Sequence, residues 1–254
     1  MLRVDLNCDL GESYGRYTLG LDEEVIPFIS SANVACGLHA GDPGVMARTV
    51  ALCAEAGVCI GAHPGFPDLQ GFGRRNMDIA PAELGGMVLY QVGALYGFCR
   101  AAGVELHHVK PHGAMYNMAV KDEAMAAAIC RAVKRFSPEL AILAPGGSKL
   151  EEAAAECGLP FICEVFADRA YMADGSLVPR SRPGAVIEDE AEAIARVIRM
   201  VADGEVQTAD GQVIAVKADS VCVHGDGAKA LAFVQKIRAA LQQAGVEIRA
   251  MSAE

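Results

Sequence analysis

Short apolar runs alternate with longer helical patterns along almost the whole chain. A strand that is followed each time by a helix implies a parallel sheet, because the helix returns the chain to the edge where the strand began. The pattern continues without a linker, so we expect residues 1–254 to form a single domain. The apolar runs predict strands at 2–8, 30–36, 58–63, 105–111, 140–144, 161–167 and 220–224.

Helical patterns fill the gaps between these strands, and several carry clear boundary signals. Asp42 stands at an N-cap position before Pro43, and Gly57 stops the same helix. The segment 121–136 begins with acids and ends with bases, which suits the helix dipole. We expect helices within 41–57, 81–103, 121–136, 146–158, 185–204 and 228–245.

A different pattern precedes the last predicted strand. Asp210 and Gly211 lie between two alternating runs, which is typical of a β-hairpin turn. Seven strand–helix units in 254 residues favour an α/β fold, namely a closed seven-stranded (β/α) barrel, TIM-like, with this small hairpin inserted. An open doubly wound sheet is the alternative, because the sequence does not reveal the order of the strands.

The first strand, in LRVDLNCDLGES, has an unusual polar face. At the two-residue period of a strand, Asp5, Asn7 and Asp9 share one face and apolar residues form the other. Asp and Asn are poor strand formers, so a special environment is indicated. In a barrel these three residues would point inward and form the floor of a site. A solvated sheet edge is the alternative interpretation.

Composition and charge limit the class of partner. The formal net charge is −10 without any run of Lys or Arg, which argues against nucleic acid or an anionic membrane surface. The first ten residues carry charges where a signal peptide would be apolar. No charge-free stretch reaches the ~20 residues of a membrane span. The nine cysteines form no CxxC pair, which favours reduced thiols in a cytoplasmic protein.

Residues that can carry chemistry gather just after the predicted strands. Both candidate folds bind ligands at the carboxyl ends of their strands. Four of the six histidines follow four different strands, which scattered placement would rarely produce, whereas His107 and His108 are assigned to core or surface. The strand ends carry Asp9, Glu12, Asn33, His39, His63, Lys110, His112, Asp168, Arg169 and His224.

The loop GFPDLQGFGRR adds Arg74 and Arg75 near the same end of the sheet. Its glycines predict a flexible lid that brings a guanidinium group to a carboxylate or phosphate. A solvated basic turn is the alternative.

Two kinds of chemistry fit these residues. Histidines and carboxylates in one cleft can act as general acid and base near neutral pH. They can also bind a divalent metal through two histidines and one aspartate, although the short metal signatures HExxH and paired CxxC are absent. Lys110 could stabilise a developing oxyanion or simply pair with Asp5 or Asp9.

The same motifs make the chain similar to a known family. DLNCDLGES, SANVACGLHAGDP, GAHPGFPDLQGFGRR, VKPHGAMYN, EVFADRAY and VHGD occur in order between Asp5 and Asp226, and together they resemble the LamB/YcsF family. The resemblance implies a barrel related to those of the glycoside hydrolase/deacetylase superfamily. It also implies one subunit of a bacterial three-component 5-oxoprolinase, which opens 5-oxo-L-proline to L-glutamate while ATP is hydrolysed to ADP and phosphate.

The resemblance further implies two partner subunits, B and C, and ATP in the assembled enzyme. The chain itself shows no nucleotide-binding motif, so the subunit that binds ATP stays open. For the implied reaction we expect His63 or His112 as the base, Lys110 and Arg74 as partners for anions, and Asp9 with Glu12 as proton carriers or metal ligands. The substrate-binding residues would be Asp5, Asn7, Asn33, His39, Arg74, Asp168, Arg169 and His224.

Two other functions are compatible with the same residues. One is a stand-alone metal-dependent deacetylase or carbohydrate hydrolase, for which a divalent metal would be required. The other is a non-catalytic subunit that binds substrate or regulates its partners. The oligomeric state and the identity of any metal are open at this point.

Overall fold

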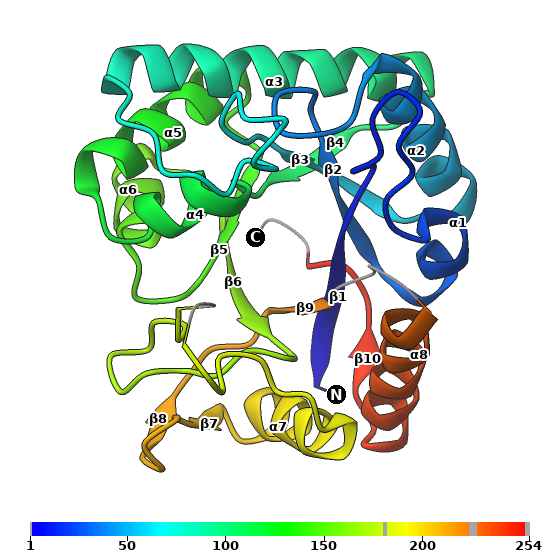
Figure 1. The fold of residues 1–254 in the computed structure, drawn as a ribbon, viewed down its shortest axis with the longest axis vertical. Coiled ribbons are helices and arrows are strands. Elements are labelled where there is room, and N and C mark those ends of the chain that lie inside the picture. Colours follow the sequence, from blue (N-terminus) through cyan, green and yellow to red (C-terminus); the bar gives the residue numbers. More distant parts are fainter. Residues whose placement is uncertain (1, 180–181, 224–227, 252–254) are drawn as a thin grey trace.

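Seven parallel strands close into a barrel in the computed structural model, which describes residues 2–179, 182–223 and 228–251 (Figure 1). Neighbouring strands pair in chain order, and β9 closes the ring because it pairs with both β6 and β1. The predicted barrel is therefore confirmed and the open sheet is wrong. The strands are β1 (Arg3–Leu10), β2 (Ser31–Ala35), β3 (Cys59–His63), β4 (Leu106–Val109), β5 (Ala141–Ala144), β6 (Phe161–Phe166) and β9 (Ser220–Val223).

Helices cover the outside of the barrel (Figure 1). Asp42 caps α2 as predicted, because its Oδ1 accepts hydrogen bonds from the backbone N–H groups of Gly44 and Val45. No helix in the described part of the chain is long and apolar enough to cross a membrane. The six predicted helices correspond to α2 (Pro43–Ala56), α3 (Pro81–Ala101), α5 (Glu123–Phe136), α6 (Lys149–Cys157), α7 (Glu190–Ala202) and α8 (Ala228–Gln243).

Several short elements complete the fold. The predicted hairpin is confirmed as β7 (Glu205–Gln207) paired antiparallel with β8 (Val213–Ala215). Elements too short to show a period in the sequence are α1 (Asp22–Val25), the 3₁₀ helix η1 (Ile26–Phe28), α4 (Gly113–Ala119) and β10 (Glu247–Ile248).

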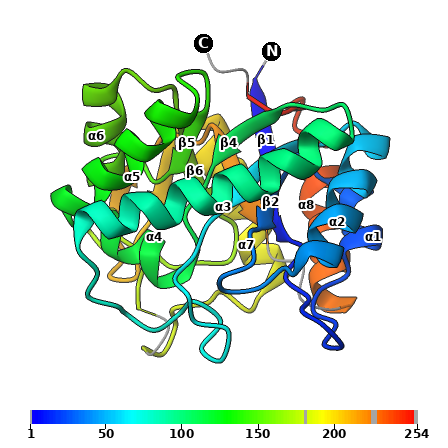
Figure 2. The ribbon, with the colours of Figure 1, turned by 90° about the horizontal axis from the view of Figure 1, so that it is seen from above.

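The last of these elements lies beside the start of the first strand. Residues of β10 pair in parallel with Arg3 and Val4 of β1. Figure 2 shows the start of β1 and the strand β10 on one side of the barrel, opposite the loops that follow β1 and β3. Those loops stand at the carboxyl ends of the strands, so the start of β1 and β10 lie away from the face where a barrel binds ligands.

The two faces of β1 are buried in different surroundings. Val4, Leu6 and Leu10 are at most 2% exposed and belong to the apolar core between barrel and helices. On the opposite face Asn7 is fully buried, and its Nδ2 donates to Ser220 Oγ on β9 at 2.7 Å. The polar face of the first strand therefore lines the barrel interior, and the interpretation as a solvated edge is wrong.

The cysteines are unpaired, as the absence of CxxC motifs predicts. All nine are free thiols, and seven of them are buried. Burial raises the pKa of the Cys36 and Cys53 thiols to about 12, so these groups stay protonated at neutral pH.

Candidate functional site

Polar residues inside the barrel form layers, and Asp5 lies in the deepest one. Its carboxylate accepts hydrogen bonds from Ser30 Oγ at 2.6 Å and Ser31 Oγ at 2.7 Å, and also from Ser220 Oγ. Burial raises the pKa of Asp5, although these hydroxyl groups oppose the shift. Asp9 is four positions after Asp5 along the strand, a rise of ~13 Å. Asp5 therefore forms the floor of the barrel rather than its mouth.

A chain of amides connects this floor with the mouth. Asn33 Nδ2 donates to Asn7 Oδ1 and to Asp9 Oδ1, both at 2.8 Å. His108 Nε2 donates to Asn33 Oδ1 at 2.7 Å, which fixes the orientation of that amide. Burial lowers the pKa of His108, so a neutral ring fits this position. The predicted place of His108 in the core is confirmed.

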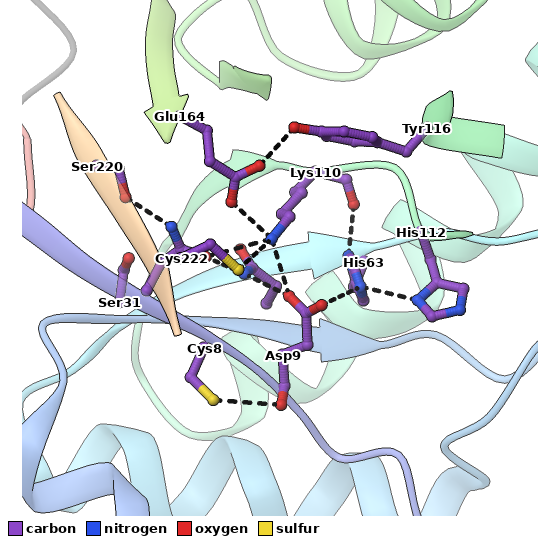
Figure 3. Close-up of polar contacts among 12 residues, drawn as sticks. Cys8, Asp9, Ser31, His63, Lys110, His112, Tyr116, Glu164, Ser220 and Cys222 are labelled. Atoms are coloured by element: carbon purple, nitrogen blue, oxygen red, sulfur yellow. Dashed lines mark hydrogen bonds and ion pairs between the residues drawn. The ribbon is translucent and has the colours of Figure 1, made fainter. Parts of the chain in front are cut away.

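Lys110 extends from the end of β4 into the middle of this network (Figure 3). Its Nζ lies 3.1 Å from Asp9 Oδ1 and 2.6 Å from Glu164 Oε1. Burial alone would lower the pKa of Lys110, but the neighbouring carboxylates outweigh it and raise the pKa well above its usual value. Lys110 is thus a buried cation that holds two carboxylates in place.

Glu164 and Tyr116 belong to the site, although the sequence motifs did not single them out. The hydroxyl of Tyr116 donates to Glu164 Oε2 at 2.6 Å, and the Glu164 side chain is fully buried (Figure 3). The available signal was an acid inside the apolar strand FICEVF. A carboxylate in such a strand needs a cation and hydrogen-bond donors, and the barrel supplies both.

Three histidines and one glutamate meet beside Asp9, and we call Glu12, His39, His63 and His112 the His–Glu cluster. One nitrogen or oxygen atom from each of the four lies within 4.8 Å of the others. His63 Nε2 is 3.0 Å from His112 Nδ1, and Glu12 Oε1 is 3.5 Å from His112 Nδ1. Glu12, His39 and His112 follow β1, β2 and β4, and His63 is the last residue of β3, so four successive strand ends build the cluster.

Burial favours neutral rings at His39 and His112. Burial, and after it the neighbouring His63, lowers the pKa of His112 to about 3. Burial also lowers the pKa of His39, whose ring stacks on His112 with centroids 3.7 Å apart. The outer oxygen of Asp9, Oδ2, lies 3.3 Å from His63 Nε2 and extends the cluster toward Lys110.

The loop after β3 covers the cluster and is anchored at several points. Asp68 is buried and accepts hydrogen bonds from the Gly71 N–H and the Arg75 guanidinium, so Arg75 is already paired. Phe72 has a left-handed backbone with φ 55°, and its carbonyl accepts from His112 Nε2 at 2.8 Å. A Cβ at Gly73 would come within 2.8 Å of His112 and His39, so only glycine fits this packing.

This anchoring differs from the predicted flexible lid. The hydrogen bonds of Asp68 and the contact at Gly73 hold the loop against the cluster. Arg74 is exposed, and its guanidinium carbon lies 5.0 Å from the centre of the Phe72 ring. A guanidinium group therefore stands at the rim of the site, on a fixed rather than a mobile loop.

Two predicted residues, Asp168 and Arg169, do not join the cluster. Arg169 is buried, and its guanidinium donates to the carbonyl groups of Ala185 and Val178, which holds the segment after β6. Asp168 is half-buried, and its backbone carbonyl accepts from Ile187 N. His224 lies outside the described residues.

Comparison with known proteins gives full-length matches. The model of the LamB/YcsF family matches residues 4–254. The chain is 59% identical over 248 residues to the A subunit of 5-oxoprolinase from Clostridium beijerinckii, covering 98% of this chain and 97% of that one. It is 54% identical over 252 residues to the A subunit of 5-oxoprolinase from Bacillus subtilis, covering 99% and 98% of the two chains.

The fold has a close match among solved structures as well. The lactam utilization protein of Thermus thermophilus superposes with a TM-score of 0.94 at 50% identity, covering 98% of this chain and all of that one. The sequence and structure matches each cover 98–99% of this chain. The chain therefore belongs to the LamB/YcsF family.

Proposed function

We propose that the chain is a component of an ATP-dependent 5-oxoprolinase, which opens 5-oxo-L-proline to L-glutamate. The observation that carries this proposal is the identity of 54–59% over nearly the full length to proteins named as the A subunit of 5-oxoprolinase. A solved relative is described as a lactam utilization protein, and 5-oxoproline is a lactam. The word subunit in the relatives' names supports further subunits, for which we propose the partners B and C.

The reaction explains why ATP is needed. A five-membered lactam is a resonance-stabilised amide and therefore a poor electrophile. Transfer of the γ-phosphoryl group of ATP to its carbonyl oxygen releases ADP and activates the ring carbon toward attack by water. Cleavage of the C–N bond in the resulting adduct, with a proton delivered to the nitrogen, opens the ring to an acyl phosphate, and a second water hydrolyses this to glutamate and phosphate. Such a site requires a proton acceptor for the water, a donor for the ring nitrogen and cations for the anionic groups. We assign the nucleotide to the assembled enzyme, without assigning it to one of the subunits.

The proton acceptor for the water is one of the atoms that converge beside Asp9. Asp9 Oδ2 and His63 Nε2 are 3.3 Å apart, and His112 Nδ1 lies 3.0 Å from the same His63 nitrogen. Low pKa values leave His39 and His112 unprotonated and able to accept. Glu12 lies on the other side of His112 and serves as the second carboxylate for proton transfer.

Lys110 and Arg74 have separate roles in this proposal. Two carboxylates already surround the Lys110 ammonium, so Lys110 orients Asp9. Arg74 is exposed beside Phe72, where its guanidinium suits the carboxylate of 5-oxoproline. The Arg74→Ala variant should therefore raise KM more than it lowers kcat.

The test is reconstitution of the purified chain with its two partner subunits, with ADP and glutamate release followed at saturating 5-oxoproline. Glutamate should form only when all components and ATP are present. His112→Ala and Lys110→Ala should abolish it, whereas Lys149→Ala, an exposed lysine on α6, should retain wild-type turnover. Circular dichroism of each variant identifies any loss of fold. Near-normal turnover in both His112→Ala and Lys110→Ala would refute the assignment of the site.

A stand-alone metal-dependent hydrolase is the second candidate, because the His–Glu cluster contains ligand types that bind divalent ions. Hydrolysis of an acetylated sugar by the chain alone, without nucleotide or partners, would favour it. A purely binding subunit would be favoured by two results together. The chain would bind substrate, and its His112→Ala variant would leave the turnover of the complex unchanged.

A further inference from the structure

The His–Glu cluster contains more hydrogen-bond acceptors than donors, and His63 shows this first. Its Nδ1 lies 2.7 Å from the backbone carbonyl of Lys110, and a carbonyl oxygen only accepts, so Nδ1 carries the proton. In a neutral ring the other nitrogen, Nε2, then carries no proton and presents a lone pair. That lone pair faces His112 Nδ1 at 3.0 Å and Asp9 Oδ2 at 3.3 Å.

His112 is fixed in the complementary way. Its Nε2 lies 2.8 Å from the Phe72 carbonyl and is therefore the protonated nitrogen. The remaining nitrogen, Nδ1, carries a lone pair and lies 3.0 Å from His63 Nε2 and 3.5 Å from Glu12 Oε1. Two nitrogen lone pairs thus point at each other across a hydrogen-bond distance, with carboxylate oxygens on both sides. Such an arrangement is repulsive unless a positive species lies between the atoms.

His39 gives a second, independent indication of a ligand. It is 1% exposed, and neither of its ring nitrogens has a hydrogen-bond partner among the residues that the structure describes. Its Nε2 lies 3.5 Å from Glu12 Oε1. A buried polar atom normally has a partner, so an unpartnered imidazole aimed into a cluster of acceptors indicates a group that the protein chain does not supply.

The spacing and the chemistry of the atoms define that group. Ligands at roughly 2.1 Å from a tetrahedral ion lie roughly 3.4 Å apart, and the separations of 3.0 and 3.5 Å in the cluster are close to this value. Imidazole nitrogens with one carboxylate suit Zn²⁺ and similar transition ions better than Mg²⁺. The Nδ1–H of His63 donates to the Lys110 carbonyl, and the Nε2–H of His112 donates to the Phe72 carbonyl. A hydrogen bond of this kind is the usual support for a metal-binding histidine.

We propose that Glu12, His39, His63 and His112 bind one divalent transition ion of the zinc class. Glu164, Lys110 and Tyr116 are not ligands, since they satisfy one another. The backbone carbonyls of Phe72 and Lys110 are positioning groups that set the ring tautomers. When bound, the ion supplies a Lewis acid beside Asp9, whose Oδ2 is then the remaining proton acceptor. The role of the ion in ring opening depends on the function proposed above, but its binding does not.

The proposal is tested on the full chain, purified without a polyhistidine tag and dialysed against a chelator. Zn²⁺, Co²⁺ or Mg²⁺ is then added, excess ion is removed, and bound metal is measured by mass spectrometry, with the visible spectrum of Co²⁺ as a second readout. Zn²⁺ and Co²⁺ should bind at roughly one ion per chain with a spectrum of low coordination number, and should raise Tm. Mg²⁺ should bind far more weakly.

Two variants address the ligands, and one serves as a matched control. Glu12→Gln and His63→Gln should each weaken Zn²⁺ binding by more than about 100-fold, since loss of even an outer partner costs 10–100-fold. His107→Gln makes the same exchange at a histidine outside the cluster, whose Nε2 donates to the Met251 carbonyl, and should bind like the wild type. Glu12→Gln keeps the size of the side chain, so it tests the site even where a histidine variant fails to fold.

The outcomes separate this proposal from the proposed function. Wild-type protein that takes up none of these ions, or variants that bind them as tightly as the wild type, would overturn the metal site. A metal-free chain that still supports glutamate formation in the complex would overturn a role of the ion in ring opening and leave the proposed function standing. A chain with stoichiometric zinc that gives no glutamate with its partners would leave the metal site standing and overturn the proposed function.

Discussion

At the scale of single residues, Lys110 is a cation enclosed by acids from two different strands. Asp9 ends β1 and Glu164 lies within β6, and both carboxylates contact the same ammonium group. Removal of one partner from a buried ion pair leaves an uncompensated charge, which costs far more than the pair contributes. The stability of the barrel and the orientation of Asp9 therefore depend on the same side chain.

The Lys110→Met variant should lose about 3–5 kcal/mol of unfolding free energy, because it removes one partner of a buried ion pair and leaves the Glu164 carboxyl group in a site without a cation. Adding Glu164→Gln to this variant should recover a large part of the loss, since the amide carries no charge. Urea unfolding of the wild type, both single variants and the double variant gives the coupling energy. Purely additive losses would show that the two side chains act independently.

Asp5 gives a prediction about pH. Burial raises its folded-state pKa above the unfolded value of 3.8, so its stabilising contribution is complete below pH 3.8 and is lost as pH rises through the folded-state pKa. Asn does not titrate. The unfolding free energy of Asp5→Asn should therefore increase relative to the wild type as pH rises from 4 toward 8, in urea titrations at constant ionic strength.

Asp42 serves as a control of opposite sign. Backbone N–H groups of Gly15 and Val45 lower its pKa, so its contribution is present above pH 3.8 and is lost as pH falls through the folded-state pKa. The difference between Asp42→Asn and the wild type should stay nearly constant above about pH 5 and shrink in stronger acid. A parallel pH trend for the two variants would contradict the assignment of Asp5 as a buried acid.

The sequence predicts which strand ends carry polar residues, but not all of their partners. His39, His63, His112 and Glu12 converge as expected, because parallel strands of a barrel end on one face. Arg169 stands in the same kind of position, yet its guanidinium donates to two carbonyls of its own loop. The direction of a side chain in an irregular loop depends on the local backbone angles. Loop sequences have no hydrophobic period from which those angles could be predicted.

At the scale of elements, each predicted strand agrees with the observed one to within two residues at either end. The pattern is clear because both faces are constrained: the helices require an apolar outer face, and the layered interior requires specific inward residues. Short elements such as α4 and β10 were missed, since a few residues cannot display a period. The hairpin was predicted from turn chemistry rather than from periodicity.

Close packing within the barrel makes one inward position of β3 sensitive. A Cβ added at Gly61 would lie 2.1 Å from His108 Nε2, so the ring would have to move and break its bond to Asn33. Gly61→Ala should lose about 3 kcal/mol of stability. Gly86→Ala on the exposed side of α3 meets no atom within 4 Å and should gain about 0.5–1 kcal/mol. Thermal unfolding measures both, and equal Tm values would contradict the packing argument.

At the scale of the whole molecule, closure of the sheet is what assembles the site. β9 pairs with β1 and β6, so residues more than 200 positions apart, such as Asn7 and Ser220, become neighbours. The order of the strands depends on which strands pair in the closed ring, and the pattern within a single segment does not determine it. The sequence therefore left an open sheet as an alternative. The count of seven strand–helix units was the decisive clue.

The location of the chain ends has a practical consequence for finding partners. The start of β1 and the strand β10, which are the described segments nearest the two ends, lie on the side of the barrel opposite the loops that carry the cluster (Figure 2). Protein immobilised on a sensor surface through either end therefore presents its mouth to the solution. A partner protein that docks over the mouth should be captured without hindrance, whereas one that covers the opposite side should bind only when the attachment is moved elsewhere.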